Sequence, residues 1–196
     1  MLVNTRWRVE ARRFSLEALL LCAAFAFAHL PLHAQATNNA PTLPANATAG
    51  MPELKAVGGG LLRVFGFQVY NAYLWTPGGS SFDRAKPYIL DLHYLRTFSA
   101  KQLAERSIDE MRGQGTGSDA VYTKWVAEMQ RVFADVKDGD RLTGVATSMR
   151  TAKFFYNGVY RGEIADPAFT DAFFGIWLSE NSSQPRMRGQ LLGKPD

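Results

Sequence analysis

Two arginines in apolar surroundings are the side chains best suited to chemistry. Arg96 continues the apolar face of an alternating stretch, two positions after Tyr94, and Arg63 follows two leucines. A guanidinium group keeps its charge and presents a fork that fits a carboxylate, so either arginine can bind an anion inside an apolar pocket, with Tyr94 as a second donor. The alternatives are a side chain that extends to water at the strand end for Arg96 and an exposed strand position for Arg63.

Other residue types that commonly carry catalysis are sparse. Thr170 lies in a nearly continuous apolar stretch, where its hydroxyl would face a cavity or bond to the backbone one turn earlier. His93 is the one histidine after residue 36, on the polar side of its stretch, and no cysteine follows Cys22. We therefore expect no metal site, no catalytic triad and no cofactor.

The first 36 residues have the pattern of a secretory signal peptide. Four arginines precede an uncharged apolar run at 18–28, which is too short to span a bilayer, and Ala34-Gln35-Ala36 then supplies small residues at a cleavage site. We expect cleavage after Ala36 and a periplasmic or secreted bacterial protein with no transmembrane helix after signal removal. A permanent N-terminal anchor is the alternative.

The remainder reads as a linker followed by one domain. Residues 37–52 are rich in Ala, Asn, Thr and Pro, which predicts a flexible linker, and residues 53–196 form the expected domain. Four of the 22 basic and two of the 18 acidic residues lie in the first 36, so the rest is nearly neutral. This charge gives no reason to expect nucleic acid as a partner, and the sequence does not define an oligomeric state.

Periodicity predicts an α+β domain with an antiparallel sheet. A long strand is expected over 61–75, bent at Gly66, after a turn at 58–60. The alternating stretch 88–98 is a second strand. The other expected elements are a helix from a capping box at Ser99 to about 112, a helix over 119–134, a strand over 141–148, a hairpin at 154–160 around Asn157-Gly158, a buried helix after Asp166-Pro167 and a short C-terminal helix.

Six groups of residues in this order are similar to the chalcone isomerase-like family of bacterial exported proteins. They are Gly60, Gly66-Phe67, Val69-Tyr70, Ala72, Leu74-Trp75; Leu92, Tyr94, Arg96, Phe98; Gly139-Asp140-Arg141-Leu142; Asn157-Gly158; Phe173-Phe174-Gly175-Ile176-Trp177-Leu178; and Arg188, Leu191-Leu192-Gly193. The resemblance implies an open-faced β-sandwich, in which helices cover one face of a large antiparallel sheet and a ligand lies between the layers. The wider superfamily includes chalcone isomerases and non-catalytic fatty-acid-binding proteins.

The resemblance also bears on catalysis. Where the isomerases have a threonine, a tyrosine and an asparagine, this chain has Gln68 and, near the other two positions, Ser99 and Arg106; Thr170 matches the late helix, and Arg63 is a candidate for the enzyme's arginine. We therefore expect an exported, non-catalytic protein that binds a small amphipathic ligand, a fatty acid in the first place. The expected ligand-binding residues are Arg63, Gln68, Tyr94, Arg96 and Thr170. The alternatives are an isomerase, an intramolecular lyase that uses Arg63, Gln68 and Thr170, and an interaction module without a pocket.

Overall fold

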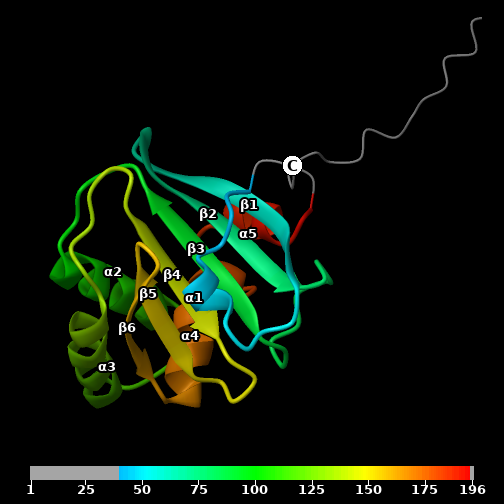
Figure 1. Cartoon of the computed structure of the whole chain (residues 1–196). Coiled ribbons are helices and arrows are strands. Elements are labelled where there is room, and N and C mark those ends of the chain that lie inside the picture. The colour runs from blue at the N-terminus through cyan, green and yellow to red at the C-terminus, as the bar shows by residue number, and fades with distance from the viewer. Residues whose placement is uncertain (1–39, 195–196) are drawn as a thin grey trace, which may run out of the picture. The chain divides into compact units, whose positions relative to one another are not determined.

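The computed structural model describes residues 40–194, and the expected signal peptide and cleavage site lie outside this range. One antiparallel sheet contains six strands in chain order (Figure 1). The strands are β1 (Leu54–Val64), β2 (Phe67–Pro77), β3 (Tyr88–Tyr94), β4 (Arg141–Ala146), β5 (Ala152–Tyr156) and β6 (Val159–Ile164). The helices are α1 (Ala45–Thr48), α2 (Ala100–Gly113), α3 (Asp119–Val132), α4 (Pro167–Leu178) and α5 (Pro185–Leu191).

The two faces of the sheet are covered unequally, as expected of an open-faced sandwich. Helices α2 to α5 share the main hydrophobic core with one face, called here the inner face. On the opposite, outer face, α1 and its flanking chain are the part of residues 40–194 that packs against the sheet (Figure 1). The predicted alternation in β3 is confirmed, because Leu90, Leu92 and Tyr94 face the inner core while Ile89 faces α1.

The predicted strand over 61–75 is in fact a hairpin. β1 and β2 pair along their length and meet at Phe65 and Gly66, both with positive φ. The error arose because the turn carries a phenylalanine instead of Asn or Asp, so the apolar run shows no break. The glycines at 58–60 lie inside β1 and do not form a turn. At Gly58 a Cβ would lie 2.0 Å from the Gln190 carbonyl oxygen, so this glycine allows α5 to pack closely on the strand.

The caps predicted for two helices are confirmed. Ser99 forms the capping box with Gln102 at the start of α2. Asp166 accepts hydrogen bonds from the first backbone N–H groups of α4, whose side chains are buried on nearly every side. The Asn157-Gly158 turn joins β5 to β6 with both residues at positive φ, as the sequence predicts.

The segment expected to be a flexible linker is in contact with the sheet over the part that is described. α1 lies within it, and Ala47 is only 3% exposed. Ala47 packs with Ile89, Val145 and Phe155, apolar side chains of the outer face that would otherwise meet water. The segment is therefore a partial cover for the outer face. Over residues 40–194, no helix has the length and apolar character needed to cross a bilayer.

Candidate functional site

A cavity of about 690 Å³ lies between the inner face of the sheet and helices α2 and α4. Its interior is apolar and buried, with walls that include Leu90, Leu92 and Phe173. Its opening is at the tip of the β1–β2 hairpin, where the lining residues Phe65 and Phe67 are 96% and 60% exposed. A volume of this size is typical of small-molecule sites.

Two tyrosines from adjacent strands lie between the opening and the apolar interior. Tyr70 and Tyr94 are cross-strand partners in β2 and β3, and their rings meet edge to face with centroids 5.6 Å apart. The Tyr70 hydroxyl accepts a hydrogen bond from Trp177 Nε1 at 2.9 Å. Within residues 40–194 neither phenolic O–H has an acceptor, and the Tyr94 side chain as a whole is only 4% exposed.

The tyrosines remain protonated at neutral pH. Desolvation by burial raises the pKa of both phenols well above the ordinary value, and for Tyr70 it outweighs the lowering effect of the Trp177 hydrogen bond. Each hydroxyl is therefore a neutral donor that lines an apolar cavity. Such groups suit a carboxylate or carbonyl oxygen, which accepts hydrogen bonds and has no proton to give.

Charged side chains gather near the opening. Arg96 lies just beyond β3, is exposed, and places its guanidinium 4.8 Å from the centroid of the Phe67 ring. Arg106 on α2 also lines the cavity and forms an ion pair with Glu110. No acid of residues 40–194 forms an ion pair with Arg96, so its charge is not neutralised by the described part of the chain.

Of the five predicted ligand-binding residues, Tyr94 and Arg96 line the cavity and Arg63, Gln68 and Thr170 do not. Arg63 lies between two lining residues of β1, so strand alternation turns it to the other side, opposite Gln68 in register. Both are exposed. The Thr170 hydroxyl donates to the backbone oxygens of Arg150 and Asp166, at 2.7 and 3.0 Å.

Sequence reasoning missed Tyr70 and Trp177. If the turn at Phe65 and Gly66 had been recognised, pairing of the resulting strands would have placed Tyr70 beside Tyr94. Trp177 was expected only to be buried, and nothing in its apolar surroundings signals that its N–H would bond to Tyr70.

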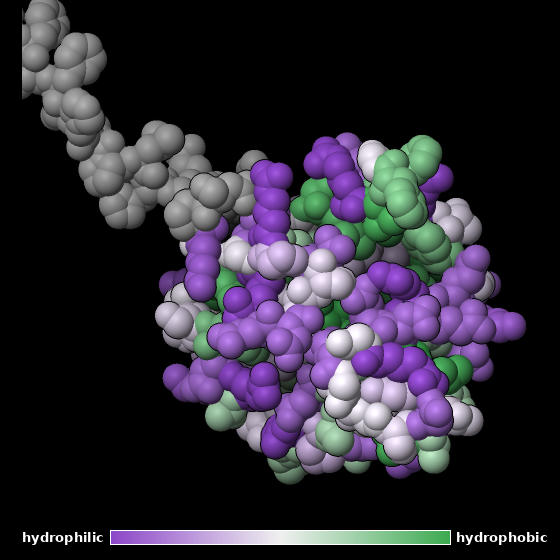
Figure 2. Space-filling view, turned by 180° about the vertical axis from the view of Figure 1, so that it is seen from behind, coloured by the Kyte–Doolittle hydropathy of each residue, from purple (hydrophilic) through white to green (hydrophobic). Residues whose placement is uncertain are grey.

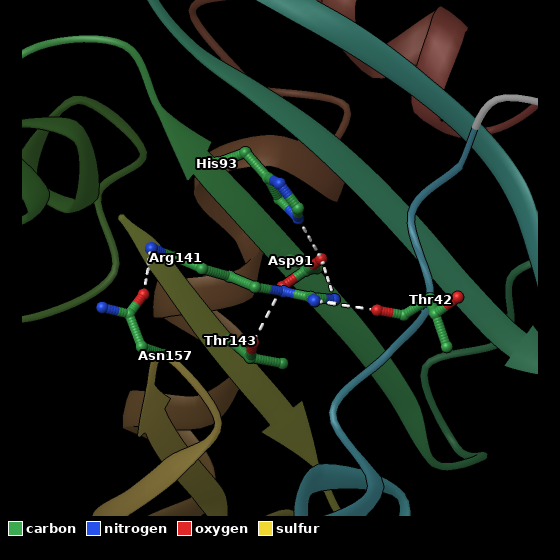
Figure 3. Close-up of polar contacts among 6 residues, drawn as sticks. All are labelled: Thr42, Asp91, His93, Arg141, Thr143 and Asn157. Carbon is green, nitrogen blue, oxygen red and sulfur yellow. Dashed lines mark hydrogen bonds and ion pairs between the residues drawn. The ribbon is translucent and has the colours of Figure 1, made fainter. Parts of the chain in front are cut away.

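A second polar cluster lies on the outer face (Figure 3). Asp91 is fully buried there, and its two oxygens accept from Arg141 Nε at 2.7 Å and Arg141 Nη2 at 2.6 Å. Thr143 Oγ1 donates to the same carboxylate at 2.7 Å, and His93 Nε2 lies 2.7 Å from it. Arg141 also donates to the Thr42 carbonyl oxygen, which ties the N-terminal segment to the sheet.

This outer cluster has the properties of a structural site. Burial alone would raise the pKa of Asp91, but the hydrogen bonds from His93 and Arg141 outweigh it and lower the pKa below the ordinary value. The carboxylate is therefore ionised and fully paired. Residues 40–194 hold no group of three His, Cys, Asp or Glu side chains that could bind a metal ion.

Comparison with known proteins agrees with this architecture. Residues 35–193 match the family described as chalcone isomerase-like, so the chain belongs to the chalcone isomerase-like family. It is 31% identical over 128 residues to an uncharacterized protein of Haemophilus influenzae; the alignment covers 65% of this chain and 62% of that relative, less than two thirds of its length. The fold is similar to the crystal structure of a fatty-acid-binding protein of Arabidopsis thaliana, with a TM-score of 0.56, 10% identity, and coverage of 71% of this chain and 87% of that one.

Proposed function

We propose that this protein binds an amphipathic carboxylate, a fatty acid in the first place, in the inner cavity and does not transform it. The observation that carries the proposal is the pair of tyrosine hydroxyls, which line the cavity next to its apolar interior and have no acceptor among the described residues. A hydroxyl that faces a cavity and donates to no protein group keeps its donor capacity for a ligand, and a hydrogen bond to a charged carboxylate contributes about 1.5–3 kcal/mol.

The shape and polarity of the cavity support a ligand with one polar end. The carboxylate would accept hydrogen bonds from Tyr70 and Tyr94, while Trp177 holds the Tyr70 oxygen in place. The acyl chain would extend inward between the apolar side chains of the sheet and α4. Arg96, at the opening, would attract the anion. The fatty-acid-binding protein of similar fold lends further support.

The arrangement gives little support to an isomerase. Gln68 and Thr170, two of the residues that such an enzyme would use, do not line the cavity. Ser99 caps α2 instead of taking the place of a catalytic tyrosine. We therefore propose that the absorbance of a chalcone decays at the uncatalysed rate even with saturating protein. A clearly faster decay would support the isomerase alternative instead.

We also propose that the chain is exported through its N-terminal signal to the periplasm or the exterior. N-terminal sequencing of protein from the cell envelope should find Thr37 as the first residue. An intact Met1 in exported material would contradict cleavage.

The main test is native mass spectrometry of purified protein, followed by calorimetric titration with saturated fatty acids of increasing length. Affinity should rise by about 0.8 kcal/mol per added methylene until the cavity is full. Arg96→Met should weaken acid binding by about 0.2–1 kcal/mol, the usual range for an exposed charge, and leave the matching alcohol nearly unchanged. Arg63→Met is the matched control, because Arg63 does not line the cavity. Absence of both a co-purified lipid and any titratable binding would overturn the proposal.

A further inference from the structure

The tip of the β1–β2 hairpin, residues 64–67, exposes apolar side chains that the fold does not use. Val64, Phe65 and Phe67 are 42%, 96% and 60% exposed. In Figure 2 an apolar patch projects at the upper right of the molecule. Figure 1 views the molecule from the opposite side and shows the tip of the β1–β2 hairpin at the upper left, which is the same end. Most other apolar side chains of residues 40–194 are at least partly buried. The exposed apolar cluster at the hairpin tip therefore indicates an interaction surface.

The backbone at the tip favours a smaller residue than the one present. Phe65 has φ of 48° and Gly66 of 82°, a turn that Asn-Gly suits and a bulky residue does not. The β5–β6 hairpin makes its turn with Asn157-Gly158, at φ of 47° and 80°. Because the Phe65 side chain is almost fully exposed, its packing within the protein does not offset the conformational free-energy cost of the positive φ. Its role therefore lies in contact with something else.

Two positively charged side chains flank the apolar tip. Arg63 precedes it, and the Arg96 guanidinium stacks on the Phe67 ring. Neither arginine forms an ion pair with an acid of residues 40–194, and the hairpin from Leu54 to Pro77 contains no Asp or Glu. Exposed aromatic side chains flanked by unpaired cations match the interface of a bilayer with anionic headgroups.

We propose that the hairpin tip docks on membranes that contain anionic phospholipid, with Phe65 and Phe67 inserted among the acyl chains and Arg63 and Arg96 at the phosphates. The tip also lines the opening of the cavity, so docking would turn the opening toward the lipid. A ligand could then pass between bilayer and cavity without crossing water, a consequence that rests on the proposed function. A second copy of the chain is a weaker candidate, because stable protein interfaces take roughly 20–30 residues a side.

Vesicle binding without added fatty acid tests docking separately from ligand binding. Wild type and variants are expressed from the full-length sequence and purified from the same cell fraction, so that all of them have the same N-terminus. Co-sedimentation compares phosphatidylcholine vesicles with vesicles that also contain phosphatidylglycerol. Wild type should bind the anionic vesicles at least tenfold more tightly, and less so as salt is added. Equal binding to both, or no binding, would overturn the proposal even if fatty acid binds in solution.

Variants at the tip have matched controls elsewhere on the surface. The double variant Phe65→Ser, Phe67→Ser should lose at least tenfold in affinity for anionic vesicles. Met149→Ser with Val159→Ser, at positions 81% and 63% exposed, should bind like wild type. Arg63→Gln should lose about fivefold, and Arg161→Gln, also exposed, should lose nothing. Equal losses in test and control variants would remove the tip from the interface.

A last variant separates docking from folding and from self-association. Phe65→Asn should raise the melting temperature, because Asn accepts a positive φ more readily, and should also weaken vesicle binding. Retained vesicle binding would overturn the proposal. Sedimentation velocity completes the test: if wild type is a dimer that tip variants convert to monomers and no vesicle binding is seen, the tip is a dimer interface and the membrane proposal is wrong.

Discussion

The two faces of the sheet differ in whether the polar groups on them have hydrogen-bond partners within the protein. On the outer face, the Asp91 carboxylate has four contacts, two from Arg141 and one each from Thr143 and His93 (Figure 3). On the inner face, Tyr94 is nearly as buried but its hydroxyl has no partner within residues 40–194. Both side chains come from β3, three residues apart, and point to opposite sides.

This difference indicates which polar groups stabilise the fold and which await a ligand. A charge that is buried and fully paired adds nothing that a ligand could use, and losing one partner destabilises the protein. A neutral donor that lines a cavity contributes little to folding and retains its capacity to bind. The sheet thus separates a structural role from a binding role within one strand.

The largest expected effect comes from breaking the outer cluster. Arg141→Met leaves the Asp91 carboxylate buried without its main partner, which should lower the free energy of unfolding by about 3–5 kcal/mol. Denaturant titration measures this change, and calorimetry at a temperature where the variant is folded should give unchanged fatty-acid affinity. Arg161→Met, at an exposed position, is the control. A loss of ligand affinity with intact stability would reverse the roles of the two faces.

The pH dependence of stability sharpens the same contrast. The folded-state pKa of Asp91 lies below its ordinary value of 3.8. The stability that ionised Asp91 provides is therefore complete above that value and is lost as pH falls through the folded-state pKa. The stability difference between wild type and Asp91→Asn should narrow as pH falls below about 4. A difference that does not change with pH in that range would show that ionised Asp91 is not the stabilising species.

A pair of hydroxyl deletions compares the faces directly. Tyr94→Phe should weaken fatty-acid binding by about 1.5–3 kcal/mol and leave stability nearly unchanged, because no described group loses a bond. Thr143→Val should lower stability by about 1.5–3 kcal/mol, since it removes a hydrogen bond to a charged group, and leave affinity unchanged. Calorimetry measures the fatty-acid affinity of both variants, and denaturant titration measures their free energies of unfolding. Equal effects of the two substitutions on stability would contradict the distinction between the faces.

The alternation of β3 and the two helix caps could be predicted because local sequence determines them. The hairpin could not, because Phe65 occupies a turn position where the usual signal is Asn or Asp. That one error also misplaced Arg63 and Gln68 and concealed Tyr70, since strand pairing decides which side chains face the cavity. Arg141 was likewise missed, because its partner Asp91 lies 50 residues away in the chain.

Thr170 provides the smallest expected effect and a separate test of the isomerase alternative. It is the residue that best matches the family's catalytic pattern, yet its one proton is shared between two backbone oxygens, those of Arg150 and Asp166. Arg150 lies in the turn between β4 and β5, so the hydroxyl ties α4 to that turn instead of serving the cavity.

Thr170→Val should therefore cost about 1 kcal/mol of stability, the usual net contribution of a neutral hydrogen bond, and leave fatty-acid affinity unchanged. Thr170→Ser keeps the hydroxyl and should recover most of that loss. Melting curves and calorimetry on the two variants separate these outcomes. A fall in affinity for Thr170→Val that Thr170→Ser restores, without a change in stability, would place the hydroxyl in the ligand site and return the isomerase to consideration, because a hydroxyl held by the backbone cannot also act on a bound substrate.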